Sequence, residues 1–128
     1  MSLLELFKHN RLYIKVSKNY VEIIDVDKNI RVSEKSEKPF SSERLLIAEF
    51  NIAENFMNDL ILKLKAKSSI NRYSSILFHP LDYTEGGIAE VENRIFLEIA
   101  ERLKGKIVKV WEGKELTNSQ VIKELKNN

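Results

Sequence analysis

Polar and apolar residues alternate along the first third of the chain. Residues 12–17, 20–26 and 30–33 carry apolar or β-branched side chains in short runs, and alternation with a period of two is typical of a half-buried strand. Turns of two and three residues, 18–19 and 27–29, join these runs. Connections this short are those of hairpins, so the pattern predicts an antiparallel meander of three strands.

The remainder of the chain changes between helical and strand-like periods. A polar loop over 34–42 contains Pro39, and the apolar run 45–48 after it fits either a strand or a helical turn. The elements expected beyond it are a helix over 51–67, a strand over 75–79, a helix over 88–104, a strand over 107–111 and a last helix from Thr117 or Asn118 to Leu125. Gly105 is expected to cap the second helix.

Each helix is expected to bury one apolar stripe against the sheet. The stripes are Ile52, Phe56, Leu60 and Leu64 in the first helix, Ile88, Val91, Ile95, Ile99 and Leu103 in the second, and Val121, Ile122 and Leu125 in the third. The strand over 75–79 contains three consecutive apolar residues, which predicts burial on both of its faces.

The order of these elements, βββαβαβα, predicts an α/β domain. A meander followed by a strand, a helix and a parallel strand gives a mixed five-stranded sheet with helices on both faces. This order resembles the ribonuclease H-like topology that actin-type ATPases and several nucleases share. We expect one domain over residues 11–128, preceded by an N-terminal amphipathic segment over residues 1–10.

Composition narrows the chemistry. The chain has no cysteine and two histidines, His9 and His79, so thiolate chemistry and cysteine-ligated metals are excluded and no cofactor is expected. The net charge is +2 and the basic residues are spread among 19 acids, whereas nucleic-acid binders concentrate basic residues on one face. No nucleic-acid partner is therefore expected. The chain shows no signal peptide and no apolar run long enough to span a bilayer, so we expect a cytoplasmic protein.

Two short motifs resemble the bacterial actin MreB. Residues 47–50 read Ile-Ala-Glu-Phe, similar to the entry into the family's first long helix, and residues 87–94 read Gly-Ile-Ala-Glu-Val-Glu-Asn-Arg, similar to the start of its second. Gly105 and the strand ending at Trp111-Glu112 stand where the family has corresponding features. The resemblance covers roughly residues 1–115 and implies an actin-like subdomain.

The first strand departs from that family. MreB proteins begin with Ile-Asp-x-Gly-Thr, in which the aspartate supports the metal and the Gly-Thr turn holds phosphate. Residues 14–18 read Ile-Lys-Val-Ser-Lys instead, so the carboxylate is replaced by Lys15 and the turn has no glycine to approach a phosphate closely. The resemblance therefore implies the scaffold of the family without its nucleotide site.

An acidic site is the alternative. Ribonuclease H-like nucleases hold two metal ions between carboxylates. Asp82, Glu85 and Glu90 gather around the Gly86-Gly87 loop, and His79 ends the fourth strand, where α/β proteins commonly bind ligands. These four residues are the candidates for a metal-dependent nuclease or hydrolase. Turn, capping and strand-end roles are the simpler interpretation, and two glycines beside Glu85 are a weak signal for anion binding.

The N-terminal segment is the second candidate for function. Leu3, Leu4, Leu6 and Phe7 stand among charged residues, and one or two helical turns of this kind suit a membrane interface or a protein partner. Packing on the domain's own sheet is the alternative. Together these features predict a non-catalytic actin-like domain that acts through a protein partner or a homo-oligomer, in the cytoplasm or at the inner membrane surface.

Overall fold

A computed structural model describes residues 10–70, 72–87 and 90–126 of the chain. Its elements are β1 (Arg11–Ser17), β2 (Tyr20–Asp25), β3 (Ile30–Lys35), α2 (Phe50–Ser68), β4 (Ser75–Pro80), α3 (Glu90–Arg102), β5 (Ile107–Val110) and α4 (Asn118–Lys126). The predicted order of strands and helices is confirmed. The expected membrane or partner residues Leu3, Leu4, Leu6 and Phe7 lie outside the described residues, so that expectation stays a prediction.

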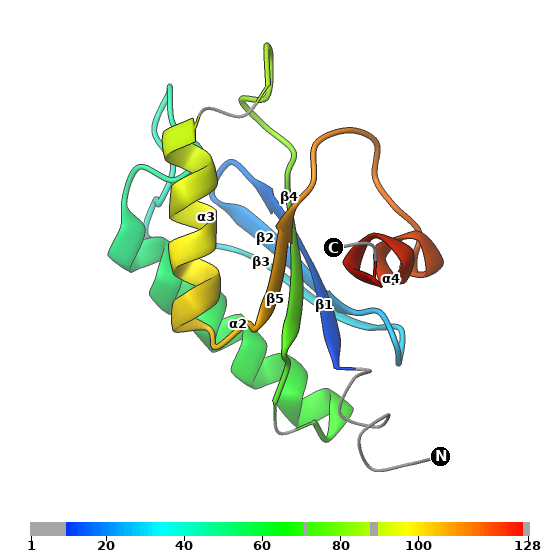
Figure 1. The fold of residues 1–128 in the computed structure, drawn as a ribbon. Helices are drawn as coiled ribbons and strands as arrows, with labels where there is room; N and C mark the ends of the chain where they lie inside the picture. The colour runs from blue at the N-terminus through cyan, green and yellow to red at the C-terminus, as the bar shows by residue number, and fades with distance from the viewer. Residues whose placement is uncertain (1–9, 71, 88–89, 127–128) are drawn as a thin grey trace.

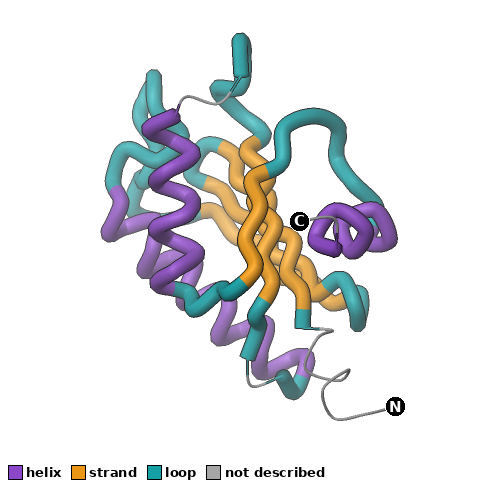
Figure 2. Tube along the Cα trace, in the orientation of Figure 1, coloured by secondary structure: helices purple, strands orange, loops and turns teal. Residues whose placement is uncertain are grey.

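The five strands form one mixed sheet in the order β3-β2-β1-β4-β5. The meander β1-β2-β3 is antiparallel, whereas β4 runs parallel to both β1 and β5. Figure 1 shows α2 and α3 on one face of this sheet and α4 on the other, and Figure 2 shows the strands enclosed between the two helical layers. The α/β class, the mixed sheet and the helices on both faces are therefore as predicted.

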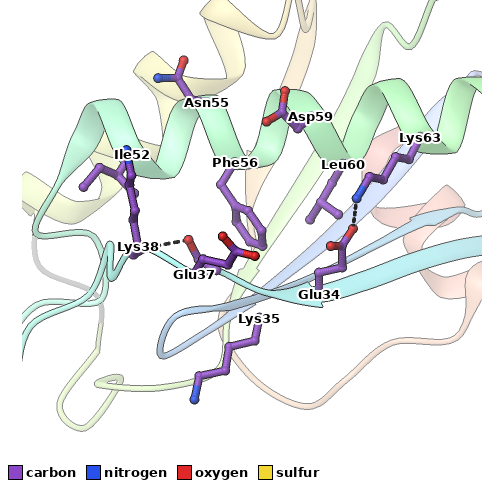
Figure 3. A pocket seen from close by; sticks show the side chains of 11 residues that line it. Glu34, Lys35, Glu37, Lys38, Ile52, Asn55, Phe56, Asp59, Leu60 and Lys63 are labelled. Atoms are coloured by element: carbon purple, nitrogen blue, oxygen red, sulfur yellow. Dashed lines mark hydrogen bonds and ion pairs between the residues drawn. The ribbon is translucent and has the colours of Figure 1, made fainter.

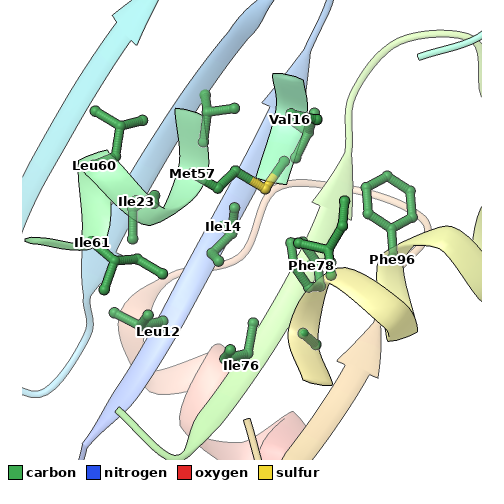
Figure 4. Close-up of a cluster of buried hydrophobic side chains, with 14 of the residues drawn as sticks. Leu12, Ile14, Val16, Ile23, Met57, Leu60, Ile61, Ile76, Phe78 and Phe96 are labelled. Carbon is green, nitrogen blue, oxygen red and sulfur yellow. The ribbon is translucent and has the colours of Figure 1, made fainter. Parts of the chain in front are cut away.

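Strand β1 stands at the centre and is covered on both faces. Leu12, Ile14 and Val16 are fully buried against α2 and α3, where Figure 4 shows them beside Met57 and Phe78. Tyr13, between them in the chain, is also fully buried but belongs to the core under α4. Because successive strand residues point to opposite faces, β1 contributes to both cores.

The smaller core lies between the sheet and α4. Thr117 caps this helix, because its Oγ1 accepts from Gln120 N–H at 3.2 Å and its own N–H donates to Gln120 Oε1 at 2.9 Å, a reciprocal capping box. The cap begins α4 at the predicted place. The buried residues of this core are Tyr13, Ile24, Val26, Leu77, Val121 and Leu125, with Ile122 at its margin.

The buried stripes of the two long helices are rotated from their expected positions. In α2 the buried residues are Ala53, Met57, Leu60, Ile61, Leu64 and Ser68, and in α3 they are Glu92, Phe96, Ile99 and Ala100. Val91 is 66% exposed, contrary to expectation. The reason in α3 is the ring of Phe96, which packs on Phe78 of β4 with a centroid distance of 5.2 Å and turns that side of the helix inward.

Two further local expectations are corrected. The apolar run 45–48 is neither a strand nor a helical turn; it is irregular, with Leu46 and Ile47 buried and Leu45 exposed. Strand β3 extends two residues beyond the expected end, to Lys35, because the antiparallel register with β2 continues to the pair Tyr20 and Lys35.

The end of α3 shows why a glycine stands at position 105. Lys104, with φ of 66°, is the left-handed residue, and Gly105 N–H donates to Ala100 O at 2.8 Å, which is the Schellman pattern. The cap is therefore one residue earlier than predicted. Gly105 is needed for space, because a Cβ there would lie 2.9 Å from Ile76 Cδ1 and 3.3 Å from Ala100 O.

Gly105→Ala should lower the free energy of unfolding by about 1–3 kcal/mol, the usual cost of overpacking, as measured by urea denaturation. The matched variant Lys104→Gly removes a side chain from the left-handed position and should not lower stability. A Gly105→Ala protein as stable as the wild type would contradict the close packing of this turn against β4.

No helix among the described residues is long and apolar enough to cross a membrane.

Candidate functional site

Two polar side chains of the neighbouring strands β1 and β4 meet on the α4 side of the sheet: Tyr13 from the first half of β1 and His79 from the carboxyl end of β4. Tyr13 Oη lies 2.6 Å from His79 Nδ1, and the two rings are stacked with centroids 5.8 Å apart. His79 Nε2 lies 2.9 Å from Gly113 O, and Leu116 N–H donates to Tyr13 Oη at 3.1 Å. Both main-chain partners belong to the segment between β5 and α4, so the pair joins that segment to the sheet.

The partners determine the protonation of the pair. Gly113 O only accepts, so His79 Nε2 must carry a proton. In a neutral imidazole the other nitrogen is then an acceptor, and Tyr13 O–H donates to Nδ1 while its oxygen accepts from Leu116 N–H. Every hydrogen-bonding atom of the two side chains is thereby satisfied with no net charge, as a buried site requires.

Burial also favours the neutral forms. It lowers the pKa of His79 below the ordinary value of 6.5, although the hydrogen bond to Gly113 and the nearby Glu115 act in the opposite direction. Burial raises the pKa of Tyr13 above 10.0, against the effect of the Leu116 hydrogen bond. His79 is 1% exposed and Tyr13 is fully buried, so neither side chain is open to solvent.

Lys15 is held by two carboxylates. Its Nζ lies 2.8 Å from Glu22 Oε1 and 2.8 Å from Glu115 Oε1, and 5.5 Å from the centre of the Tyr13 ring. Burial acts to lower the pKa of Lys15, but the hydrogen bonds to Glu115 and Glu22 outweigh it and raise that pKa. The hydrogen bond from Lys15 lowers the pKa of Glu115.

The predicted acidic candidates lie apart from this pair. Asp82 Oδ2 accepts from Lys18 N–H at 2.6 Å, which joins the β4–α3 loop to the β1–β2 turn, while Glu85 and Glu90 are exposed. Among the residues that the structure describes, no three His, Asp or Glu side chains are grouped to hold a metal ion. The structure therefore does not bring these acids together with His79.

The glycine pair of the same loop has the geometry of a turn. Gly86 and Gly87 have φ of 77° and 95°, values that favour glycine. A Cβ on Gly87 would lie 3.5 Å from Glu112 Oε1, so a carboxylate adjoins the turn. An anion at this turn would meet a like charge.

Tyr13, Gly113, Glu115 and Leu116 were not among the sequence-predicted site residues. The sequence does contain a signal for Tyr13, because Tyr13 and Lys15 are polar residues that alternate with the apolar residues of the first strand and so share its other face. Their partnership with His79 depends on the parallel register that sets Lys15 opposite His79, which the residue pattern alone does not specify.

Comparison with known proteins gives one relevant similarity. The chain is 34% identical over 93 residues to the uncharacterized protein YjaA of Escherichia coli strain K12, a match that covers 69% of this chain and 72% of that protein. No family model matches the chain.

The buried pair predicts a loss of stability in mild acid. Below pH 6.5 the unfolded histidine takes up a proton that the folded His79 resists, because its folded pKa is lowered. The free energy of unfolding should therefore fall as the pH drops from 6.5 toward the folded pKa, by at most about 1.4 kcal/mol per pH unit for one proton.

Urea denaturation between pH 7.5 and 5.0 measures this effect, with His79→Gln as the control. The amide can donate and accept as neutral imidazole does but does not titrate, so the variant should lose less stability over this range. His9 is present in both proteins and cancels in the comparison. If the free energy of unfolding changed equally with pH in the two proteins, a histidine held neutral by its surroundings would be ruled out.

Proposed function

The chain belongs to the same family as YjaA of Escherichia coli, and we propose that this member is a non-catalytic domain that acts by binding another protein. The fold proposed for it is the ribonuclease H-like fold, in its actin-like form. The features that support this fold are the antiparallel meander, the parallel pairing of β1 with β4 and of β4 with β5, and helices on both faces of the sheet.

One observation carries the proposal of a non-catalytic role. In α/β sheets ligands bind at the carboxyl ends of parallel strands, and here His79, near the carboxyl end of β4, is in contact with Tyr13 of β1. The residues between β5 and α4 close over them through Gly113 and Leu116. The space in which a reactive carboxylate or a phosphate would lie is filled by a satisfied hydrogen-bond network.

The charge at this end of the sheet agrees with that proposal. The Lys15 ammonium group lies 5.5 Å from the centre of the Tyr13 ring and is already shared by Glu22 and Glu115. A phosphate arriving here would have to displace both carboxylates from Lys15. These two ion pairs therefore support a structural role for Lys15. In MreB-type proteins the matching position is an aspartate that supports the metal.

The resemblance of two short motifs to MreB-type proteins supports a role in association, in cell shape or cytoskeletal organisation. Both motifs that carry the resemblance stand at helix entries, since α2 begins at Phe50 and the described part of α3 begins at Glu90. A domain that resembles these proteins at the helix entries and lacks their phosphate turn suits binding to another protein. No arrangement among the described residues favours the hydrolase alternative.

Isothermal titration of the whole chain with Mg-ATP should show no binding heat. The physical reason is that His79 and Lys15, toward the carboxyl ends of β4 and β1, are already paired with protein groups. Thermal unfolding with and without Mg-ATP is the second readout, and the midpoint should not move. Micromolar affinity, or a midpoint raised by Mg-ATP, would contradict the proposal.

A further inference from the structure

The edge of the sheet at β3 is open and lies beside a groove. Because β3 is the terminal strand of the sheet, no strand among residues 10–70, 72–87 and 90–126 pairs with the outer side of its backbone. Helix α2 packs over β2 and β3, and the groove between this helix and the end of β3 encloses about 380 Å³. Figure 3 shows it from close by, with α2 above and the end of β3 below.

The register identifies the backbone groups that face the open side. Ser36 N–H donates to Asn19 O at 2.8 Å, and in an antiparallel pair such hydrogen-bonded positions recur at every second residue. The backbone N–H and C=O groups of residues 34, 32 and 30 therefore point toward β2. Those of Arg31, Ser33 and Lys35 point outward. All three outward residues are exposed.

The two sides of an added strand would meet different chemistry. On the side of α2 the groove is lined by Ile52, Phe56 and Leu60 and, around them, by polar and charged residues that include Glu34, Asn55, Asp59 and Lys63. Figure 3 shows Phe56 pointing from α2 toward β3. On the opposite side, β3 presents Arg31 and Lys35; Figure 3 shows Lys35 directed away from α2. A strand beside β3 would therefore need apolar residues alternating with acidic ones.

We infer that β3 binds an extended segment of a partner protein, in which acidic and apolar residues alternate, as a sixth strand of the sheet. Main-chain hydrogen bonds to Arg31, Ser33 and Lys35 supply the attachment, and the pockets for alternate side chains supply the selectivity. The inference rests on the proposed function and names the surface and partner chemistry for it.

A second copy of the chain is a poorer occupant. Two β3 strands paired antiparallel about Ser33 would set Arg31 of one copy opposite Lys35 of the other, twice. Like charges directly opposite on one face of a sheet are destabilising, and charged edge positions are a common means of preventing such self-pairing. Lys35, together with Arg31, whose Nη1 also lies 3.7 Å from Glu22 Oε2, attracts a strand that carries carboxylates.

The test is selection of linear peptides from a phage-displayed random library on the immobilised whole chain. Selected peptides are synthesised, and their affinity is measured by fluorescence polarisation for the wild type, Ser33→Pro, Lys35→Glu and the control Lys106→Glu. Proline at position 33 removes an outward N–H and no ladder hydrogen bond. Lys106 is an exposed lysine near the opposite edge strand, β5, so its variant matches the charge change of Lys35→Glu.

We expect selected peptides to alternate acidic and apolar residues. Their affinity should fall at least tenfold with Ser33→Pro and with Lys35→Glu and should be unchanged with Lys106→Glu. If Ser33→Pro fails to fold, as judged by circular dichroism, the two charge-reversal variants Lys35→Glu and Arg31→Glu are used for the test instead. Recovery of no peptide, or of peptides that bind all the variants equally, would overturn the inference.

A third outcome is a wild-type dimer in sedimentation that Ser33→Pro converts to monomer; this would assign the edge to a second copy and overturn the choice of partner. Failure here is distinct from failure of the proposed function. Peptides that bind elsewhere contradict the β3 site alone, whereas binding of Mg-ATP contradicts the non-catalytic role and leaves the β3 result standing.

Discussion

The hydroxyl group of Tyr13 sets the main constraint on this structure. The central strand is covered on both faces, so this oxygen is buried, and a buried hydroxyl without a partner costs roughly 1–3 kcal/mol. His79 Nδ1 accepts a hydrogen bond from this hydroxyl, and Leu116 N–H donates one to its oxygen. To provide both partners, the chain must place a histidine at the end of β4 and return the segment after β5 over the sheet, which in turn positions α4.

This constraint connects the fold with the proposed function. Strand β1 uses Leu12, Ile14 and Val16 for the larger core and Tyr13 for the smaller one. The carboxyl end of β4, where α/β sheets commonly hold ligands, is thereby used to attach the segment that leads to α4. Among the described strands, β3 forms one edge of the sheet and has a groove beside it.

Much of the fold was predictable because it depends on local periods. The alternation of polar and apolar residues predicted the meander, and the apolar run before His79 predicted a strand buried on both faces. Thr117, as a capping residue, predicted the start of α4. The helix orientations were not, because α3 has apolar residues on more than one side: Val91 is exposed and Phe96 is buried. Which side faces the sheet depends on contacts with Phe78, far away in sequence. The Tyr13–His79 pair needed the β1–β4 register for the same reason.

The central claim is that His79 is neutral, carries its proton on Nε2 and accepts from Tyr13. Long-range proton–nitrogen correlation spectra of the ¹⁵N-labelled chain at pH 7 report the tautomer of each histidine directly, and His9→Gln assigns the two signals. The account predicts the Nε2–H tautomer for His79, with a pKa below 6.5 and no change on addition of Mg-ATP. A protonated ring or an Nδ1–H tautomer at pH 7, or signals that shift with Mg-ATP, would contradict it.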